Sequence, residues 1–277
     1  MQSLNARFIP YASRGGAENM AIDEYLVSLH GRTGMAAFRV YGWSPPAISL
    51  GRYQGIDCLD LDACRADSVA VVRRITGGGA IYHGRELTYS LVLGNDDLDG
   101  KPRDVPDSFN KMNRFLILFY RWLGFQASYS CDSGGNDRAA ARPDFCYSGN
   151  ERFDILIGGK KIGGNAQRRL GKTVLQHGSI PFVINRDRVA RYFKGGMAGG
   201  GFTTLTELAG RDLDAGAKAR LLAESFAEVT GLRLKQEDIG PGEKAEIESI
   251  MNTRYLDRQW TREGRMDDNE GEKTAMA

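Results

Sequence analysis

Two glycine-rich segments interrupt strand-like stretches of the chain, and they constrain its fold more than any other feature. The first is Arg73-Arg74-Ile-Thr-Gly-Gly-Gly-Ala-Ile-Tyr-His83, and the second runs from Gly158 to Arg169. Consecutive glycines break a strand and let backbone N–H groups approach a ligand without a Cβ in the way. The 35 glycines follow no Gly-X-Y period, which excludes a collagen-like fold. The two clusters therefore predict turns that border a ligand site.

Neither glycine segment matches a nucleotide-binding loop. No G-x-G-x-x-G opens a helix with an acidic residue about 20 positions later. A Walker A loop ending at Gly171-Lys172-Thr173 fails as well, because its first glycine falls on Ala166. The first segment begins with two arginines and the second contains two lysines. Backbone amides and cations together favour binding of a carboxylate, a phosphate or a developing oxyanion. The alternative is a pair of hairpin turns that carry exposed basic residues.

Composition and charge exclude several classes of protein. Hydrophobic residues make up 42% and charged residues 26%, as in globular domains. The net charge of +2 gives no overall field for nucleic acid, and no apolar run approaches the roughly 18 residues of a membrane span. The N-terminus lacks a secretory pattern. The four cysteines and three histidines match no zinc spacing. We expect a cytoplasmic protein with reduced thiols and no metal site.

Hydrophobic periodicity predicts an α+β fold, with a mixed, mainly antiparallel sheet flanked by helices. A strand over 87–93 alternates as if one face were buried, and Phe115, Leu116, Phe119 and Trp122 share one side of a helix. Gly158-Gly159 reads as a two-residue hairpin turn. Strands do not alternate strictly with helices, so a Rossmann layout is not expected. Predicted helices cover 18–30, 57–66, 107–123, 187–194, 214–229 and 243–257, and predicted strands cover 36–42, 47–51, 69–75, 87–93, 153–157, 160–169 and 174–180.

The predicted organisation has three parts. Residues 1–210 are expected to form one large domain, and residues 211–262 a helical segment packed on it. Residues 263–277 are polar and are expected to be a disordered tail.

At this point the motifs resemble those of a known family. The segment from Arg73 to His83 resembles the signature of the lipoate-protein ligase and octanoyltransferase family, which shares its catalytic fold with biotin-protein ligases. Gly159-Lys-Lys-Ile-Gly-Gly-Asn-Ala166 is similar to the family's second motif, and Gln176-His-Gly-Ser-Ile180 follows at the family's spacing. The resemblance covers roughly residues 7–260 and implies a biotin/lipoate-protein-ligase-like catalytic domain.

The family contains two kinds of enzyme, ligases and octanoyltransferases, and the motifs of this chain resemble both. Ligases activate lipoate with ATP, whereas octanoyltransferases move octanoate from acyl carrier protein through an acyl-cysteine. Cys146, 15 residues before Lys161, lies where cysteine-dependent octanoyltransferases of the lipoyl-M type carry their nucleophile, and Glu86-Leu-Thr-Tyr-Ser90 also resembles the transferases. The Gly-Gly-Gly-Ala run ending at Ala80, and Asp154, instead resemble the ligases.

The resemblance also implies a set of site residues. Cys146 would accept the acyl group as a thiolate, with Lys161 as the nearby cation that lowers the thiol pKa. Lys161 would also orient the thioester or take the proton of the incoming amine. Val72, Ile81 and Tyr89 are candidates for the acyl tunnel. The acyl, carboxylate or adenylate end would be held by Arg74, Gly77, Gly78, Gly79, His83, Gly163, Gly164, Asn165, Ala166, His177 and Gly178.

Three functions remain open from the sequence. In the first, the protein transfers an octanoyl or lipoyl group to a lysine of a lipoyl carrier domain in protein lipoylation. Octanoyl-acyl carrier protein is then the donor, glycine cleavage H protein or a 2-oxoacid dehydrogenase E2 is the acceptor, and no cofactor is needed. The second is a lipoate-protein ligase that uses ATP and Mg through lipoyl-adenylate. The third is a non-catalytic acyl- or carrier-binding protein. An acidic carrier would meet the basic residues Arg138, Arg142, Arg168 and Arg169.

Overall fold

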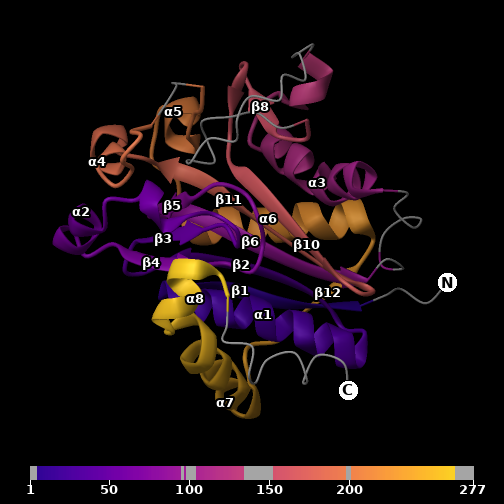
Figure 1. Ribbon diagram of the computed structural model, residues 1–277. Helices are drawn as coiled ribbons and strands as arrows, with labels where there is room; N and C mark the ends of the chain where they lie inside the picture. The colour runs from indigo at the N-terminus through magenta and orange to yellow at the C-terminus, as the bar shows by residue number, and fades with distance from the viewer. Residues whose placement is uncertain (1–4, 95–96, 98–103, 134–151, 198–200, 266–277) are drawn as a thin grey trace.

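A computed structural model describes residues 5–94, 97, 104–133, 152–197 and 201–265 (Figure 1). Within these residues a six-stranded sheet forms the centre of the molecule, in the order β10-β11-β6-β2-β1-β12. The pairs from β10 to β2 are antiparallel, and β1 is parallel to both β2 and β12. The predicted mixed, mainly antiparallel sheet is confirmed. Its strands are β1 Asn5–Arg14, β2 Ala36–Trp43, β6 Arg85–Gly94, β10 Gly164–Leu170, β11 Thr173–Val183 and β12 Arg233–Gln236.

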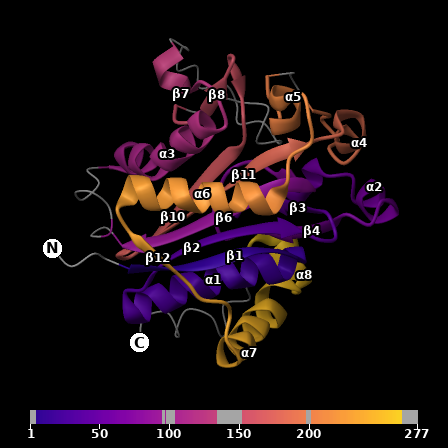
Figure 2. The same ribbon diagram turned by 180° about the vertical axis from the view of Figure 1, so that it is seen from behind.

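Helices cover both faces of this sheet (Figures 1 and 2). The helix α1 (Gly16–Thr33) packs on one face, together with α7 (Pro241–Ile250). The other face is covered by α3 (Val105–Trp122) and α6 (Ala215–Thr230), which contribute to the largest hydrophobic core cluster. Both α3 and α6 begin at an aspartate whose carboxylate accepts a backbone N–H of the first turn.

Because both faces of the large sheet are covered, the expectation that β6 has only one buried face is wrong. Leu87, Leu91 and their alternate neighbours pack toward α3 and α6, as the alternation predicts. Thr88, Ser90 and Val92 on the opposite face are buried as well. The strand therefore has two buried faces rather than one, because α1 and a small sheet formed by residues 47–50, 70–73 and 81–83 cover the second face. The polar side chains of Thr88 and Ser90 on that face are hydrogen-bonded.

The helix α3 follows its predicted packing, with one exception. Phe115, Leu116 and Phe119 are buried in the core, as expected. Trp122, expected on the same side, is 44% exposed. It is the last residue of the helix, where the packed face ends.

Two small sheets complete the fold in the described part of the chain. One has the order β4-β3-β5 and the other β7-β8-β9. Gly158 and Gly159 both adopt positive φ, at 59° and 74°, between the antiparallel β8 and β9, so the predicted hairpin turn is confirmed. The strands are β3 Ala47–Leu50, β4 Ala70–Arg73, β5 Ile81–His83, β7 Ala127–Tyr129, β8 Ile155–Ile157 and β9 Lys160–Lys161.

The single strand predicted over 160–169 is wrong, because the chain changes sheets within it. β9 ends at Lys161, and β10 starts at Gly164 in the large sheet. The change occurs at Gly163, which has a φ of 91°. A Cβ on Gly163 would overlap the carbonyl oxygen of Ser179 on β11. Only glycine fits this crossing without strain.

The C-terminal stretch over 211–262 is not purely helical. Besides α6 and α7 it contains α8 (Arg258–Glu263) and the strand β12, which extends the large sheet beside β1. A π-helical turn over Met251–Tyr255 follows α7. Across the described residues, none of the helices combines the length and the apolar character needed to cross a membrane. The remaining elements are short: η1 Ile56–Cys58, α2 Leu61–Ala66, η2 Ser130–Ser133, α4 Arg186–Ala190 and α5 Leu205–Ala209.

Candidate active site

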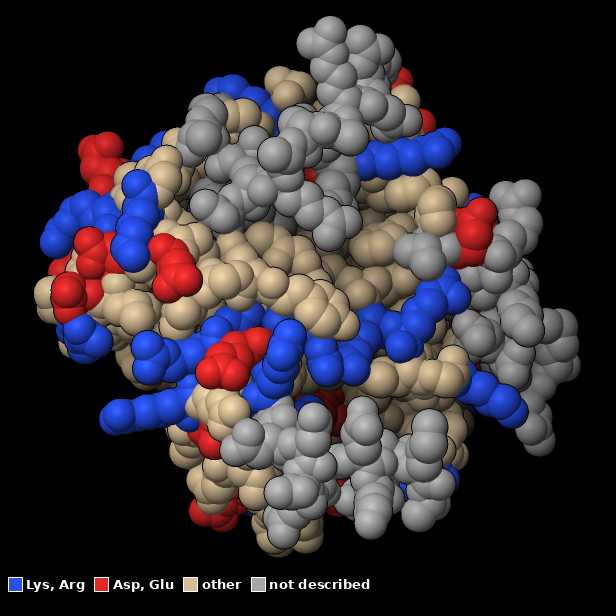
Figure 3. Space-filling view, viewed as in Figure 1, with Lys and Arg blue, Asp and Glu red and all other residues tan. Residues whose placement is uncertain are grey.

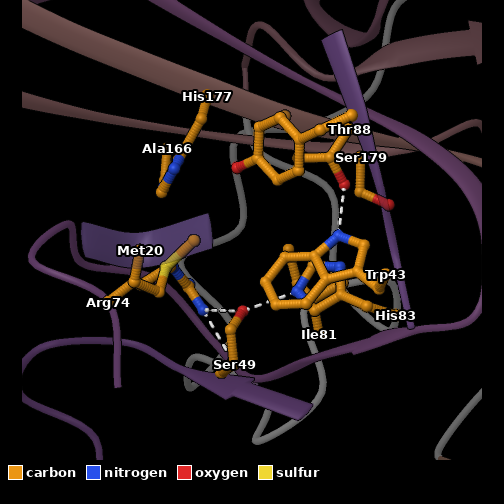
Figure 4. Close-up of a pocket in the computed structure, with 12 residues that line it drawn as sticks. Met20, Trp43, Ser49, Arg74, Ile81, His83, Thr88, Ala166, His177 and Ser179 are labelled. Carbon is orange, nitrogen blue, oxygen red and sulfur yellow. Dashed lines mark hydrogen bonds between the residues drawn. The ribbon is translucent and has the colours of Figure 1, made fainter. Parts of the chain in front are cut away.

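A pocket lies between the large sheet and the small β4-β3-β5 sheet (Figure 4). It contains about 290 Å³ of space without protein atoms, partly open to solvent. Five residues singled out from the sequence meet there, namely Arg74, His83, Ala166, His177 and Gly178. Ile81, a tunnel candidate, lines it too, whereas Val72 and Tyr89 are not among its lining residues. Six further lining residues were not predicted as site residues, although Thr88 and Ser179 lie in the quoted motifs: Met20, Tyr41, Trp43, Ser49, Thr88 and Ser179.

Strand register explains why these side chains meet. On the small sheet Ser49 is opposite Ile81, and His83 lies two residues further along the same face. On the large sheet Ser179 is opposite Thr88, and His177 is opposite Ser90. The large-sheet row lies on the face opposite α3 and α6. The two rows face each other across the pocket (Figure 4).

His83 is held from three sides. Its Nδ1 lies 2.7 Å from Glu86 Oε1, and its Nε2 lies 2.7 Å from Ser49 Oγ. The indole of Trp43 stacks on the imidazole, with ring centroids 3.8 Å apart and planes 9° apart. Glu86 also accepts hydrogen bonds from the hydroxyls of Thr88 and Ser179. All of these side chains are buried, so the orientation of the imidazole is fixed.

His177 forms a second oriented imidazole. Its Nδ1 lies 3.3 Å from Asp23 Oδ2, and its Nε2 lies 2.6 Å from Thr76 Oγ1. Burial lowers the pKa of His177 against the opposing pull of Asp23. Burial alone would raise the pKa of Asp23, but the hydrogen bond from His177 and the charge of Arg39 outweigh it, so the pKa lies below its ordinary value. The pair is therefore a neutral imidazole donating to a carboxylate.

Arg74 organises the first glycine segment. Its guanidinium donates to the carbonyl oxygens of Gly77 and Gly79 at 2.7 and 2.8 Å. It also donates to the carbonyl oxygen and hydroxyl of Ser49, at 2.8 and 3.1 Å. Gly78, between the two acceptors, has a φ of 93°. The loop is thus wrapped around a buried cation whose side chain also lines the pocket.

Among the described residues of the second glycine segment, Ala166 is the one that lines the pocket. Ala166 on β10 lines it opposite His177, whereas its neighbour Asn165 points to the other face of the sheet and accepts a hydrogen bond from Tyr89. Gly178 lies between Asn165 and Tyr89, and a Cβ there would overlap the amide oxygen of Asn165. Gly163 and Gly164 make the crossing from β9 to β10, and neither is among the lining residues.

Lys161 is buried in an ion pair outside the pocket lining. Its Nζ lies 2.7 Å from Asp154 Oδ2, and the two side chains are 3% and 9% exposed. Asp154 just precedes β8, so the Gly158-Gly159 hairpin brings the two residues together. The predicted nucleophile Cys146 lies outside the described residues. Elsewhere, burial raises the pKa of Cys64 to about 11, which makes that thiol unreactive.

Basic side chains gather beside the pocket. Figure 3 shows a band of Lys and Arg across the face on which α8 and β10 are seen in Figure 1, bordering a hollow of uncharged residues. Arg168 lies two residues after the pocket residue Ala166 and donates to the carbonyl oxygen of Ile75. Burial, followed by the charges of Arg52 and Arg254, lowers the pKa of Arg168. Arg138 and Arg142 lie outside the described residues.

Metal ligands are not grouped in the part of the chain that the structure describes. No cluster of three His, Cys, Asp or Glu side chains is found there with a geometry able to hold a metal ion.

Sequence comparison finds relatives that match most of the chain. The octanoyltransferase LipM of Symbiobacterium thermophilum is 33% identical over 277 residues, covering 92% of this chain and 97% of that protein. The octanoyltransferase LipM of Kyrpidia tusciae is also 33% identical, with the same coverage.

Two solved structures show the same fold. A crystal structure of lipoate-protein ligase A bound with ATP has a TM-score of 0.80 at 22% identity, covering 95% of this chain and 100% of that one. The structure of protein Ta0514 from T. acidophilum with bound lipoic acid has a TM-score of 0.78 at 21% identity, covering 94% of this chain and 100% of that one. The model of the lipoyl protein ligase A/B catalytic domain family matches residues 16–227. The chain therefore belongs to the lipoyl protein ligase A/B catalytic domain family.

Proposed function

We propose that the protein is an octanoyltransferase that moves an octanoyl group onto a lysine of a lipoyl carrier domain through a transient acyl-cysteine at Cys146. The observation that carries this proposal is the similarity to octanoyltransferases over 92% of the chain. The pocket between the two sheets supports it, because apolar and aromatic side chains there adjoin oriented polar groups, as an acyl chain with a reactive carbonyl requires.

The charged groups have distinct tasks in this proposal. Lys161, held by Asp154, supplies the positive charge that favours a thiolate and orients the thioester. Arg74 and the glycine loop hold the carbonyl end of the acyl chain. The imidazoles of His83 and His177 line the pocket at the same end.

The test is intact-mass analysis after incubation with octanoyl-acyl carrier protein. The wild type should gain one octanoyl group, which an apo lipoyl domain then removes. Cys146→Ala should gain none, and Cys131→Ala is the matched control because Cys131 is a half-buried free thiol. Transfer by Cys146→Ala at the wild-type rate would contradict the acyl-cysteine.

The partners follow from the same proposal. Octanoyl-acyl carrier protein is the donor, and the lipoyl domain of an H protein or an E2 subunit is the acceptor. Carrier proteins of this kind are acidic, which suits Arg168, two residues after the pocket residue Ala166, and the charges of Arg52 and Arg254 that act on it. The reaction needs no cofactor. The three described cysteines are free thiols, which suits a reducing cytoplasm.

A second candidate function is ATP-dependent lipoate ligation. The observation that favours it is the glycine loop around Arg74, whose motif resembles the ligases, together with the fold shared with a ligase bound with ATP. ATP and Mg would then be required. Pyrophosphate release on mixing with lipoate, ATP and Mg²⁺ tests it, and turnover that survives Cys146→Ala would establish the ligase.

A further inference from the structure

Three arginines meet outside the pocket, beside the start of the first glycine segment. Arg52, just after β3, donates its backbone N–H to the carbonyl oxygen of Thr76 at 2.8 Å. The guanidinium of Arg168 on β10 donates to the neighbouring carbonyl oxygen of Ile75 at 3.1 Å. Burial lowers the pKa of Arg168, and the charges of Arg52 and Arg254 lower it further. The three cations therefore act on one another as a single cluster.

Within the described residues, aromatic rings rather than carboxylates contact the guanidinium of Arg52. Its Cζ lies 5.7 Å from the ring centroid of Tyr53 and 5.5 Å from that of Trp260. Arg254 lies over the same indole at 5.0 Å, so Trp260 supports two of the cations. The Nε of Arg52 is buried and has no hydrogen-bond partner in this part of the chain. Tyr53 is 86% exposed, so the cluster borders solvent on this side.

The cluster carries more positive than negative charge. Glu24 on α1 is the carboxylate that acts on it, and its two oxygens already accept hydrogen bonds from Arg254 and from the hydroxyl of Tyr255. Arg254 is thereby paired, whereas Arg52 and Arg168 have no acidic partner among the described residues. Guanidinium forks match the oxygens of an oxyanion, and phosphate in particular. The two remaining cations therefore form a site for one phosphate group.

The cluster lies next to the pocket but outside it. Arg168 is two residues after the lining residue Ala166, a separation of about 7 Å along a strand. Neither Arg52 nor Arg168 is among the lining residues. Figure 3 shows basic side chains on this face bordering a hollow of uncharged residues. A phosphate bound by the cluster can therefore belong to a molecule whose apolar end enters the pocket.

We infer that Arg52 and Arg168, with Arg254 beside them, bind the phosphate of the arm on which the donor presents its acyl group, an inference that rests on the proposed octanoyl transfer. An acyl carrier protein holds its acyl thioester at the end of a phosphopantetheine arm, and a phosphodiester joins this arm to the protein. The phosphate is the anionic group of the arm, and the thioester lies at the opposite end. A phosphate held by the arginines directs the thioester toward the pocket. The acceptor lysine carries no phosphate, so the site acts in loading and not in amide formation.

The experiment compares two small donors that differ only in the phosphate. Octanoyl-pantetheine and octanoyl-phosphopantetheine carry the same thioester, and intact mass measures the second-order rate constant with which each loads the enzyme. The wild type should prefer the phosphorylated donor by about 10-fold or more. In Arg52→Gln and Arg168→Gln this preference should fall toward one, because glutamine is neutral and has no guanidinium fork. A merely structural role would slow loading from both donors to the same extent and leave the preference unchanged.

Arg220→Gln is the matched control. Arg220 is an exposed arginine on α6, which packs on the face of the large sheet turned away from the pocket. Its replacement removes the same charge from a distant surface, so the preference for the phosphorylated donor should equal that of the wild type. Arg168→Lys keeps the charge but loses the fork, and it should retain part of the preference. This conservative variant keeps the test valid if Arg168→Gln fails to fold.

The outcomes separate the two proposals. If the wild type loads equally well from both donors, or if both glutamine variants keep its preference, the phosphate site is wrong and the octanoyltransferase stands. ATP is the other source of a phosphate. Pyrophosphate release from lipoate and ATP that falls in both variants, without loading from either thioester, would assign the cluster to a nucleotide and overturn the inference. If the wild type loads from no octanoyl donor, octanoyl-acyl carrier protein included, the proposed function fails, and the inference fails with it.

Discussion

At the scale of single residues, the close approach of Gly51 to the glycine loop sets the shape of the pocket wall. A Cβ on Gly51 would overlap the carbonyl oxygen of Gly78, which is backbone and cannot rotate away. Gly51→Ala should therefore push the 77–79 loop off Arg74 and destabilise the fold by about 1–3 kcal/mol. Urea unfolding monitored by fluorescence would measure the loss.

Gly55→Ala provides the control for this substitution. Gly55 lies in the same connection, has a φ of −64° and has open space where a Cβ would point. Gly55→Ala should change the free energy of unfolding by less than about 1 kcal/mol, and any change should be an increase. Equal unfolding midpoints for the two variants would show that the contact with Gly78 does not constrain the loop.

The residues of the site were predictable to different degrees. Arg74 and His177 belong to contiguous motifs, and the structure does place both at the pocket. Ser49 carries no such signal, because it lies in an ordinary strand pattern and becomes informative only when strand pairing places it beside His83. Trp43 becomes informative as a site residue only when the large sheet packs on the small one and its indole stacks on His83. Long-range partners of this kind depend on pairing between strands, which local sequence patterns do not specify.

At the scale of elements, an ion pair ties α7 to the first strand. Arg7 on β1 donates to both carboxylate oxygens of Glu243, at 2.5 and 2.8 Å, and Tyr25 on α1 donates to the same carboxylate. The Arg7 hydrogen bonds hold the pKa of Glu243 down to about 2, against an ordinary value of 4.5. The link joins α7 to two elements near the N-terminus, β1 and α1.

This lowered pKa predicts a dependence of stability on pH. Because the folded pKa lies below the unfolded one, the contribution of Glu243 is complete above pH 4.5 and is lost as the pH falls toward 2. The carboxylate is 22% exposed, so solvent screening limits the contribution to about 1–2 kcal/mol. Glu243→Gln should lower the free energy of unfolding at pH 7 by this amount and have little effect near pH 2.

Glu246→Gln is the control on the same helix. Glu246 pairs with Arg32, but both side chains are more than 40% exposed, so the loss at pH 7 should stay below about 0.5 kcal/mol. A loss for Glu243→Gln that is the same at pH 7 and pH 2.5 would contradict the ionic origin.

Periodicity identified most of the helices and central strands, but not how the strands are joined. The break at Gly163 was invisible because the residues on both sides are compatible with strands, and only the contact with Ser179 forces the chain into another sheet. β12 was missed because three of its four residues are polar, and it is a strand only through its pairing with β1.

At the scale of the whole molecule, Arg73 joins the C-terminal helix to the body of the protein. Its guanidinium donates to the carbonyl oxygens of Trp260, Thr261 and Arg262, and also to those of Gly51 and Gln54. Arg73 is 1% exposed, so these carbonyl groups replace water around the buried charge.

Removal of α8 should therefore cost more than its short length suggests. A chain that ends at Asp257 leaves Arg73 without the 260–262 carbonyls and loses the buried Trp260, so the free energy of unfolding should fall by at least about 3 kcal/mol. A chain that ends at Arg265 is the control, and urea unfolding compares the two. Equal midpoints would show that α8 only covers the surface.

The pairing of β1 with β12 has a consequence for how the protein is made. Asn5 pairs with Arg233, so the outer side of the first strand has no partner until the ribosome has released most of the chain. At about 5–20 residues per second, the wait lasts roughly 10–45 seconds. During synthesis an open strand side of this kind invites contacts with other nascent chains. Folding in the cell therefore depends on shielding the N-terminal strand until a late segment arrives.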